Sequence, residues 1–270
     1  MMQTLRVEDV RAESIDTLLE LCIPLERRND KYFIEGAHLK SDWVIESINR
    51  FGSVAKIAYL GSKPAGLIQY LPDPSEGIVE IKCIFVPDKL DQRKGVGRAL
   101  MKDLIGDLRK GLFDLYSPSA LVTWAFQVPG YYPQNEFYLR MGFKRVREDD
   151  PFLLYYPLKE GFRYSPIDRK YTPLPEDKGR ALIFYDPSCP FCMYFAGCME
   201  SLIREVAPDL CIRMINTFKE PEEVRRRGEV PPCVVNGIPI SSFFLDGENF
   251  KKEVENALRD NPRGSEGKYL

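Results

Sequence analysis

The sequence predicts a two-domain α/β chain: a mixed-sheet domain followed by a second, smaller α/β domain. The 270 residues exceed one ordinary domain and suit two. Two apolar, strand-like runs, at residues 81–86 and 181–185, each lead through a short loop into an amphipathic helical pattern. Between them, residues 161–179 contain three prolines and no sustained period, which is typical of a linker. We therefore expect domains at residues 1–160 and 180–270.

Composition narrows the class of partners. The chain is 44% hydrophobic with a formal net charge of −2, so no strong overall field draws it to nucleic acid or to anionic lipid. It has no run of 18 apolar residues, and its charged start lacks an apolar signal core. The seven cysteines indicate free thiols with redox or metal use rather than a disulfide framework. We expect a cytoplasmic protein without nucleic-acid or membrane partners.

The loop after the first strand-like run has the features of a pyrophosphate site. Gly95 and Gly97 let the backbone approach a bound group closely, because no Cβ is in the way. A helix begins there, and its first N–H groups and positive dipole end favour an anion. Arg93, Lys94 and Arg98 add positive charge. The helix itself is predicted by apolar residues at helical spacing: Val96, Leu100, Met101, Leu104, Ile105 and Leu108.

Two common phosphate motifs do not fit this loop. The ATP-binding loop requires Lys and then Ser or Thr after its last glycine, whereas Arg98 and Ala99 stand here. The dinucleotide fingerprint requires a third Gly or Ala, and Leu100 occupies that position. A tight turn without a ligand is the alternative that the loop alone leaves open.

Four further segments in the same order give the first half a family resemblance. Residues 53–70 read as a hairpin turning near Gly61, residues 77–86 as a strand into the loop, and residues 120–126 as the next strand. Residues 136–146 then contain Phe-Tyr-x-x-x-Gly-Phe, with Gly142 suited to a helix C′ position. Together with Gln-x-x-Gly-x-Gly, this pattern over about residues 1–160 resembles the GNAT family of N-acetyltransferases.

The resemblance implies acetyl-CoA as cofactor and an amine as acceptor, either a small molecule or a peptide. It implies Glu80 as general base and Tyr138 as general acid. The strand edge that would pair with the pantetheine arm is Ile84, Phe85 and Val86. The pyrophosphate would be held by Gln92, Arg93, Lys94, Gly95, Val96, Gly97 and Arg98.

Each of these roles has a structural alternative. Glu80 on a strand can be a half-exposed surface residue, and Lys82, on the same strand face, would lower its pKa and weaken it as a base. Tyr138 can be a packed aromatic under its helix. Trp124, Tyr131 and Tyr132 could line the acceptor pocket or fill the core.

The second half places two cysteines at a strand-to-helix junction. Cys189 and Cys192 follow the strand-like residues 181–185, and a helical stripe begins directly after them. The helix N-terminus favours a thiolate at Cys189. A second strand at residues 210–215, a short helix at 222–227 and a hairpin turning at Asn236-Gly237 are expected next.

This order of elements, over about residues 180–260, resembles the thioredoxin/glutaredoxin fold. The resemblance implies a cis bond at Pro231, opposite the cysteine pair. Cys233 would then lie near Cys189 and Cys192 and could form another disulfide or complete a thiolate metal site. A metal pair or two inert cysteines remain alternatives, and fold does not establish redox activity. No metal is assigned.

The preferred function is acetyl transfer from acetyl-CoA to an amine of an unknown acceptor. The fused arrangement resembles the YoaP-like acetyltransferases. The alternative is a thiol-disulfide or metal-handling protein in which Cys189 and Cys192 act and the first half senses CoA. A third possibility is a binding module whose second domain docks a partner. The sequence leaves the acceptor, the acyl chain length and the oligomeric state open.

Overall fold

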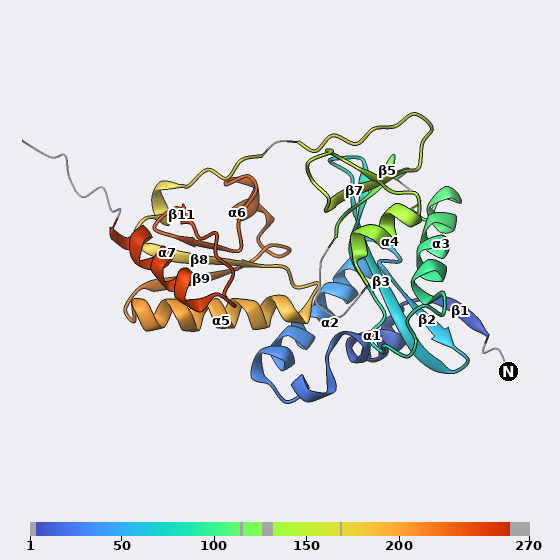
Figure 1. Cartoon of the computed structure of the whole chain (residues 1–270), viewed down its shortest axis with the longest axis horizontal. Helices are drawn as coiled ribbons and strands as arrows, with labels where there is room; N and C mark the ends of the chain where they lie inside the picture. Colours follow the sequence, from blue (N-terminus) through green and yellow to red (C-terminus); the bar gives the residue numbers. More distant parts are fainter. Residues whose placement is uncertain (1–3, 114–115, 126–131, 168, 260–270) are drawn as a thin grey trace, which may run out of the picture. The chain divides into compact units, whose positions relative to one another are not determined.

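A computed structural model describes residues 4–113, 116–125, 132–167 and 169–259 (Figure 1). The chain divides into two compact units. The first contains residues 1–26 and 41–167, and the second contains residues 27–40 and 168–270. Helix α2 (Lys31–Phe51) therefore begins in the second unit and ends in the first. Within the described residues no helix is both long and apolar enough to cross a membrane.

The first unit is built on a seven-stranded sheet in the order β1-β2-β3-β4-β5-β7-β6. All neighbouring strands are antiparallel except β4 and β5, which are parallel. The predicted hairpin and the two strands that follow it are confirmed. The strands are β1 (Leu5–Asp9), β2 (Ala55–Leu60), β3 (Lys63–Asp73), β4 (Ile78–Phe85), β5 (Ala120–Trp124), β6 (Lys144–Arg145) and β7 (Leu153–Pro157).

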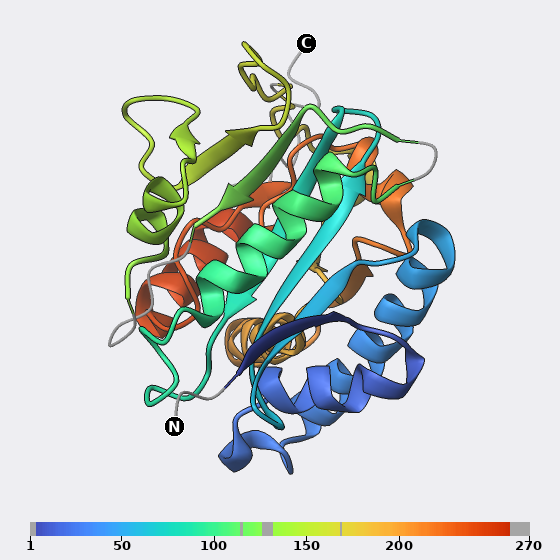
Figure 2. The same ribbon diagram turned by 90° about the vertical axis from the view of Figure 1, so that its right-hand side faces the viewer.

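Helix α3 (Val96–Arg109) covers one face of this sheet, as Figure 2 shows. Its six predicted apolar residues are all buried and join the main core. Burying such a stripe against the sheet is what stabilises the helix, because an isolated helix of this length is marginal in water. The other helices that hold residues of this unit are α1 (Ile15–Cys22), the second half of α2, and α4 (Gln134–Arg140); η1 (Ala12–Ser14) and η2 (Leu25–Arg27) are short 3-10 turns.

Strands β4 and β5 pair only over their first residues. The parallel register runs from Ile78 opposite Ala120 to Glu80 opposite Val122, and no further pair follows it among the residues that the structure describes. On its other edge β4 carries a bulge, because Tyr70 and Gln69 of β3 face Ile81 and Cys83. A bulge of this kind bends the strand and increases its twist. The last residues of β4 are therefore separated from β5 before the chain enters the loop to α3.

The second unit has a four-stranded sheet in the order β11-β10-β8-β9. Strands β8 and β9 are parallel, and the other two pairs are antiparallel. The predicted turn at Asn236-Gly237 is confirmed, with φ of 54° and 79°. The elements are η3 (Pro175–Asp177), β8 (Arg180–Tyr185), α5 (Pro190–Val206), β9 (Cys211–Asn216), α6 (Pro221–Arg225), β10 (Cys233–Val235), β11 (Ile238–Pro239) and α7 (Gly247–Arg259).

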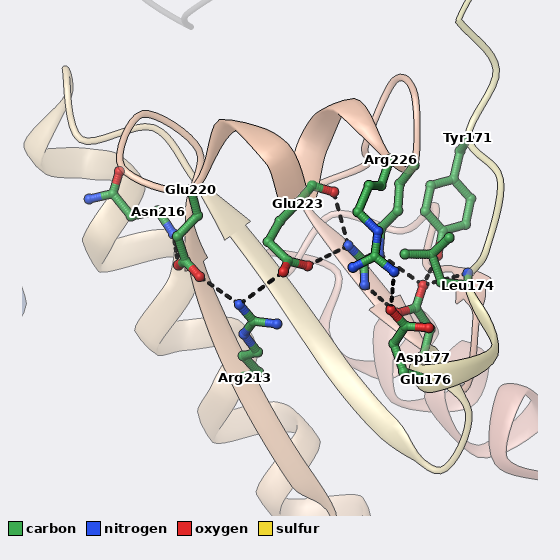
Figure 3. Close-up of polar contacts among 10 residues, drawn as sticks. Tyr171, Leu174, Glu176, Asp177, Arg213, Asn216, Glu220, Glu223 and Arg226 are labelled. Atoms are coloured by element: carbon green, nitrogen blue, oxygen red, sulfur yellow. Dashed lines mark hydrogen bonds and ion pairs between the residues drawn. The ribbon is translucent and has the colours of Figure 1, made fainter.

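The end of the expected linker is fixed to the second unit by charged pairs. The Asp177 carboxylate accepts two bonds from the Arg227 guanidinium, at 2.6 and 2.9 Å, and both side chains are buried. Arg226 and Glu176 pair beside them on the surface, as Figure 3 shows. The proline-rich composition indicates a linker, but it carries no signal for this buried ion pair.

One expectation about the backbone is wrong. The described residues contain no cis peptide bond, so Pro231 is trans. The Phe184 N–H donates to the Pro232 carbonyl at 3.0 Å, one position before the register of Cys233 and Ile183, so pairing with β8 begins directly after Pro231. The trans form of an X–Pro bond is the one of lower energy, by about 0.5–1 kcal/mol.

Candidate functional sites

The loop between β4 and α3 presents exposed backbone at the predicted pyrophosphate site. Gly95 is the N-cap of α3 with φ of 87°, and Arg93 also has a positive φ, of 63°. Arg93, Lys94, Gly95 and Arg98 are exposed, whereas Val96 is buried and anchors the helix. The first-turn amides of α3 cannot be bonded within the helix, so this loop offers N–H donors to an anion.

A cluster of acid–base pairs, unforeseen in the sequence, fixes this loop. Asp91 is 4% exposed and bonds Lys63 at 2.7 Å and Lys94 at 3.0 Å. Lys63 also bonds Asp88 at 2.7 Å. The hydrogen bond from Lys63 is the main reason that the pKa of Asp91 is lowered, so its carboxylate stays charged. Lys94 is thus partly neutralised by Asp91, and Arg93 and Arg98 are the stronger candidates for a phosphate.

The β4 edge and Gln92 have partners within the protein. The Gln92 side-chain amide donates to the Val86 carbonyl at 3.2 Å, which closes the loop on itself. Gln134 of α4 donates to the Ile84 carbonyl at 3.3 Å. The sequence assigns Ile84, Phe85 and Val86 to a bound pantetheine arm. A ligand that paired with Ile84 would therefore take the place of the Gln134 amide.

Tyr138 lies where β4 and β5 separate. The Thr123 hydroxyl donates to the Ile81 carbonyl at 3.2 Å, one residue beyond the last β4–β5 pair. The Tyr138 hydroxyl oxygen lies 3.4 Å from the Thr123 oxygen, and the side chain is 1% exposed. Burial raises the pKa of Tyr138, which keeps the hydroxyl protonated and able to donate. Its ring packs on Phe143 at 5.0 Å, so the role of a packed aromatic is present as well.

Glu80 is not brought together with Tyr138. Its carboxylate pairs with the Lys82 ammonium at 2.8 Å, as the shared strand face predicts. Side chains alternate along a strand, so Glu80 points away from the face of Val79 and Ile81, which belong to the core cluster of Tyr138. The two catalytic candidates therefore lie on opposite faces of β4.

Two of the three candidates for an acceptor pocket can be placed. Trp124, at the end of β5, is 52% exposed. Tyr132 donates to Glu136 at 3.0 Å, and the Arg140 guanidinium lies 5.3 Å from its ring centre. Tyr131 falls outside the described residues. Trp124 and Tyr132 are both exposed and thus available to contact an acceptor.

The second unit holds Cys189 at the N-cap of α5, as predicted. The Cys192 thiol hydrogen-bonds to the Cys189 sulfur, and this bond is the main reason that the pKa of Cys189 is lowered to about 7. The same contact, together with burial, raises the pKa of Cys192. One thiol of the pair is thus favoured as the thiolate.

The remaining cysteine candidate lies in the core. Cys233 is 1% exposed and packs in one cluster with Ile183 and Ala196. Burial raises its pKa to about 12, which disfavours a thiolate. Among the residues that the structure describes, no group of three or more His, Cys, Asp or Glu side chains is placed to hold a metal ion.

Comparison with known proteins bears on the first half of the chain. Residues 15–143 match the model of the acetyltransferase (GNAT) family. No curated protein matches the chain. Similar solved structures include a GNAT acetyltransferase from Staphylococcus aureus Mu50, with 14% identity, a TM-score of 0.44 and coverage of 58% of this chain and 100% of that chain.

Two further structures of this kind contain the cofactor. PaiA N-acetyltransferase from Thermoplasma acidophilum, in complex with coenzyme A, is 14% identical with a TM-score of 0.43, covering 57% of this chain and 99% of that chain. A GNAT acetyltransferase from Brucella melitensis, in complex with acetyl-CoA, is 15% identical with a TM-score of 0.42. The match covers 62% of this chain and 94% of that chain. Likeness at this level does not transfer an activity to this chain. The match to the GNAT family model therefore covers most of the first unit, including the loop between β4 and α3 and Tyr138 of α4.

Proposed function

We propose that the first unit transfers an acetyl group from acetyl-CoA to an amine, carried by a small molecule or a peptide. The observation that carries this proposal is the separation of β4 from β5 directly before an exposed, glycine-rich helix N-terminus. A separated strand leaves backbone donors and acceptors for an extended thioester arm, and the helix N-terminus suits the diphosphate at the other end of that arm.

The backbone amides, the arginine side chains and the acid–base pairs of the loop contribute to acetyl-CoA binding in different ways. The amides from Arg93 to Gly97 face the diphosphate, and the Arg93 and Arg98 guanidinium groups neutralise its charge. The Asp91 pairs with Lys63 and Lys94 hold the loop in the left-handed conformation that Gly95 adopts. Preorganisation of this kind lowers the conformational cost of binding.

Tyr138 is the better of the two catalytic candidates. An attacking amine expels the CoA thiolate, which takes a proton as it leaves. A tyrosine whose hydroxyl is kept protonated, at the point where the strands part, is suited to donate that proton. Glu80 is the weaker candidate, because it is paired with Lys82 on the opposite face of β4.

The test is CoA release from acetyl-CoA with a panel of amines, comparing the wild type with Tyr138→Phe. We expect kcat to fall by about 10²-fold, the lower range for loss of a general acid, with little change in KM. The substitution keeps the ring that packs on Phe143, so the melting temperature should stay within a few degrees. An unchanged kcat in a folded Tyr138→Phe variant would show that Tyr138 serves only in packing.

A matched control separates the effect of losing the Tyr138 hydroxyl from the effect of changing the core around it. Tyr156→Phe removes a hydroxyl that accepts from Arg109 at 2.9 Å, also from a ring packed on Phe143. Tyr156 is not part of the proposed catalytic group, so its variant should release CoA at the wild-type rate.

The second unit resembles a thioredoxin-like domain in the order and direction of its strands. Its βαβ and ββα halves, with β8 central and parallel to β9, support that proposal, as does the cysteine pair at the start of α5. The combination of both units resembles the YoaP-like acetyltransferases. All seven cysteines are free, which supports a reducing, cytoplasmic location. A second function, thiol chemistry at Cys189, is favoured by the position of Cys189 at the N-cap of α5, next to the Cys192 thiol.

A further inference from the structure

Thr123 of β5 joins β4 to β5 just beyond the point where their backbone pairing ends. The last backbone pair is formed by Glu80 and Val122, and Thr123 is the next residue of β5. Its hydroxyl donates to the carbonyl of Ile81, the next residue of β4, at 3.2 Å, and Thr123 is 2% exposed. The side chain of Thr123 therefore extends the contact between the two strands by one more bond.

The same hydroxyl contacts the Tyr138 hydroxyl of α4. The two oxygens lie 3.4 Å apart. A threonine hydroxyl has one proton to donate and can also accept. Because that proton goes to the Ile81 carbonyl, the Tyr138 hydroxyl donates to the Thr123 oxygen. This bond is longer than the usual range of about 2.5–3.0 Å, so the Tyr138 proton is held weakly and stays available to a stronger acceptor.

A Tyr138 that gives up its proton becomes a charged group in an apolar surrounding. Its side chain is 1% exposed and shares a core cluster with Ile81, Leu121 and Phe143. A buried charge is costly unless a hydrogen bond stabilises it. Burial raises the pKa of Tyr138, and the hydrogen bond with Thr123 counters part of this rise. Among the residues that the structure describes, Thr123 is the one that bonds the Tyr138 hydroxyl.

We propose that Thr123 is a positioning residue for acetyl transfer, which holds the Tyr138 hydroxyl where β4 and β5 separate and turns its own proton to the Tyr138 oxygen when Tyr138 is ionised. This inference rests on the proposed function of the first unit. The Thr123 oxygen is within reach of both the Ile81 carbonyl and the Tyr138 oxygen. The change therefore requires only a rotation of the O–H bond, without movement of the backbone.

The reaction step balances in atoms and charge. The amine nitrogen attacks the thioester carbonyl carbon, a C–N bond forms, and the C–S bond breaks with its electron pair on sulfur. The Tyr138 proton goes to that sulfur, which leaves as the thiol of CoA. The nitrogen loses its extra proton to water, and the Tyr138 phenolate takes a proton back from water. Thr123 keeps its own proton throughout and changes only the oxygen to which it donates.

The test compares Thr123→Val and Thr123→Ser in the full-length protein. CoA release is measured with acetyl-CoA and with the amine of the panel that the wild type acetylates fastest. Valine keeps the branched shape without the hydroxyl, so we expect kcat to fall by about tenfold with little change in KM. Serine keeps the hydroxyl and should stay within about twofold of the wild type. A folded Thr123→Val variant with the wild-type kcat would overturn the inference.

A double variant distinguishes an effect through Tyr138 from a general loss of packing. Residues that act as a unit have effects that do not add. If Thr123 acts through the Tyr138 hydroxyl, Thr123→Val combined with Tyr138→Phe should be no slower than Tyr138→Phe alone. A further tenfold loss in the double variant would contradict this role, because the valine would then act without the hydroxyl.

Thr217→Val is the matched control. The Thr217 hydroxyl of the second unit also donates to a backbone carbonyl, that of Tyr185, at 3.2 Å. Its removal should leave CoA release at the wild-type rate. If Thr123→Val does not fold, Thr123→Ala removes the same hydroxyl and carries the same expectation. A wild type that acetylates no amine overturns the proposed function and this inference together, whereas an active wild type with an unaffected Thr123→Val overturns this inference alone.

Discussion

At the scale of single residues, both units contain buried charged side chains that the composition does not predict. Lys56 of β2 is 1% exposed and bonds Asp9 at 2.8 Å, Asp103 at 2.8 Å and Asp107 at 2.5 Å. Asp91 fixes the loop between β4 and α3, and Asp177 fixes the end of the linker. A buried charge is tolerated only when it is paired, so each of these sites depends on its partner.

The Asp177–Arg227 pair gives a stability prediction. Asp177→Asn removes the charge that faces a buried guanidinium, and breaking such a pair typically costs about 3–5 kcal/mol. We expect a loss in this range in the free energy of unfolding, measured by urea denaturation of the second unit's transition. The control is Glu176→Gln, which removes the charge from the exposed pair with Arg226 and should change the stability little.

The same pair predicts a pH dependence. Burial raises the pKa of Asp177, but the Arg227 guanidinium and the Leu174 amide outweigh it, so the pKa is lowered in the folded state. A carboxyl with a lowered folded pKa stabilises the protein above its ordinary value, about 3.9, and this contribution is lost as the pH falls through the lower value. The difference between the wild type and Asp177→Asn should narrow below about pH 4. A constant difference down to pH 2 would contradict this assignment.

At the scale of elements, the cofactor loop depends on two left-handed residues before α3. Gly95 has φ of 87° with nothing within 4 Å of an added Cβ, so a substitution there strains the backbone without a clash. The strain falls on the segment whose amides we propose to face the cofactor. The binding of acetyl-CoA and the geometry of this loop are therefore linked.

Gly95→Ala should weaken acetyl-CoA binding. A left-handed alanine costs about 1 kcal/mol, so we expect a rise of roughly fivefold in Kd, measured by calorimetry. The control is Gly106→Ala in the middle of α3, where an added methyl also meets open space and φ is not positive. That variant should bind normally and be stabilised by about 0.5–1 kcal/mol. Unchanged affinity in Gly95→Ala would show that the loop does not hold the cofactor.

At the scale of the whole molecule, the two units are not consecutive in sequence. Residues 27–40 complete the second unit, where Phe33 contacts Phe191 and Tyr194, and Gly36 adjoins Pro190. The polypeptide then returns to the first unit within a single helix. Integrity of the second unit therefore requires the N-terminal part of the chain.

A fragment of residues 169–270 tests this dependence. Without α2 it exposes the apolar faces of Phe191 and Tyr194, so we expect a lower urea midpoint than for the second unit in the full chain, and binding of a hydrophobic dye. A synthetic peptide of residues 27–51 should restore part of the lost stability, and the same peptide with Gly36→Leu should not. A fragment as stable as the unit in the intact chain would show that α2 is dispensable.

The sequence by itself determined the elements with strong local signals. The apolar stripe from Val96 predicts α3, Asn236-Gly237 predicts the hairpin, and the pattern around Cys189 and Cys192 predicts a strand-to-helix junction; all three are confirmed. These features depend on periodicity and on backbone conformations that few residues adopt, and both are readable in a short window.

Only the tertiary structure decided which distant residues meet. It put Glu80 and Tyr138 on opposite faces of β4, kept Pro231 trans, and brought Gly36 of α2 against Pro190 of α5 across about 150 residues of sequence. No local pattern in the sequence of α2 shows which element the helix packs against, because a sequence does not distinguish a buried lysine from a solvated one. Such contacts are set by the packing of whole elements, which no local pattern encodes.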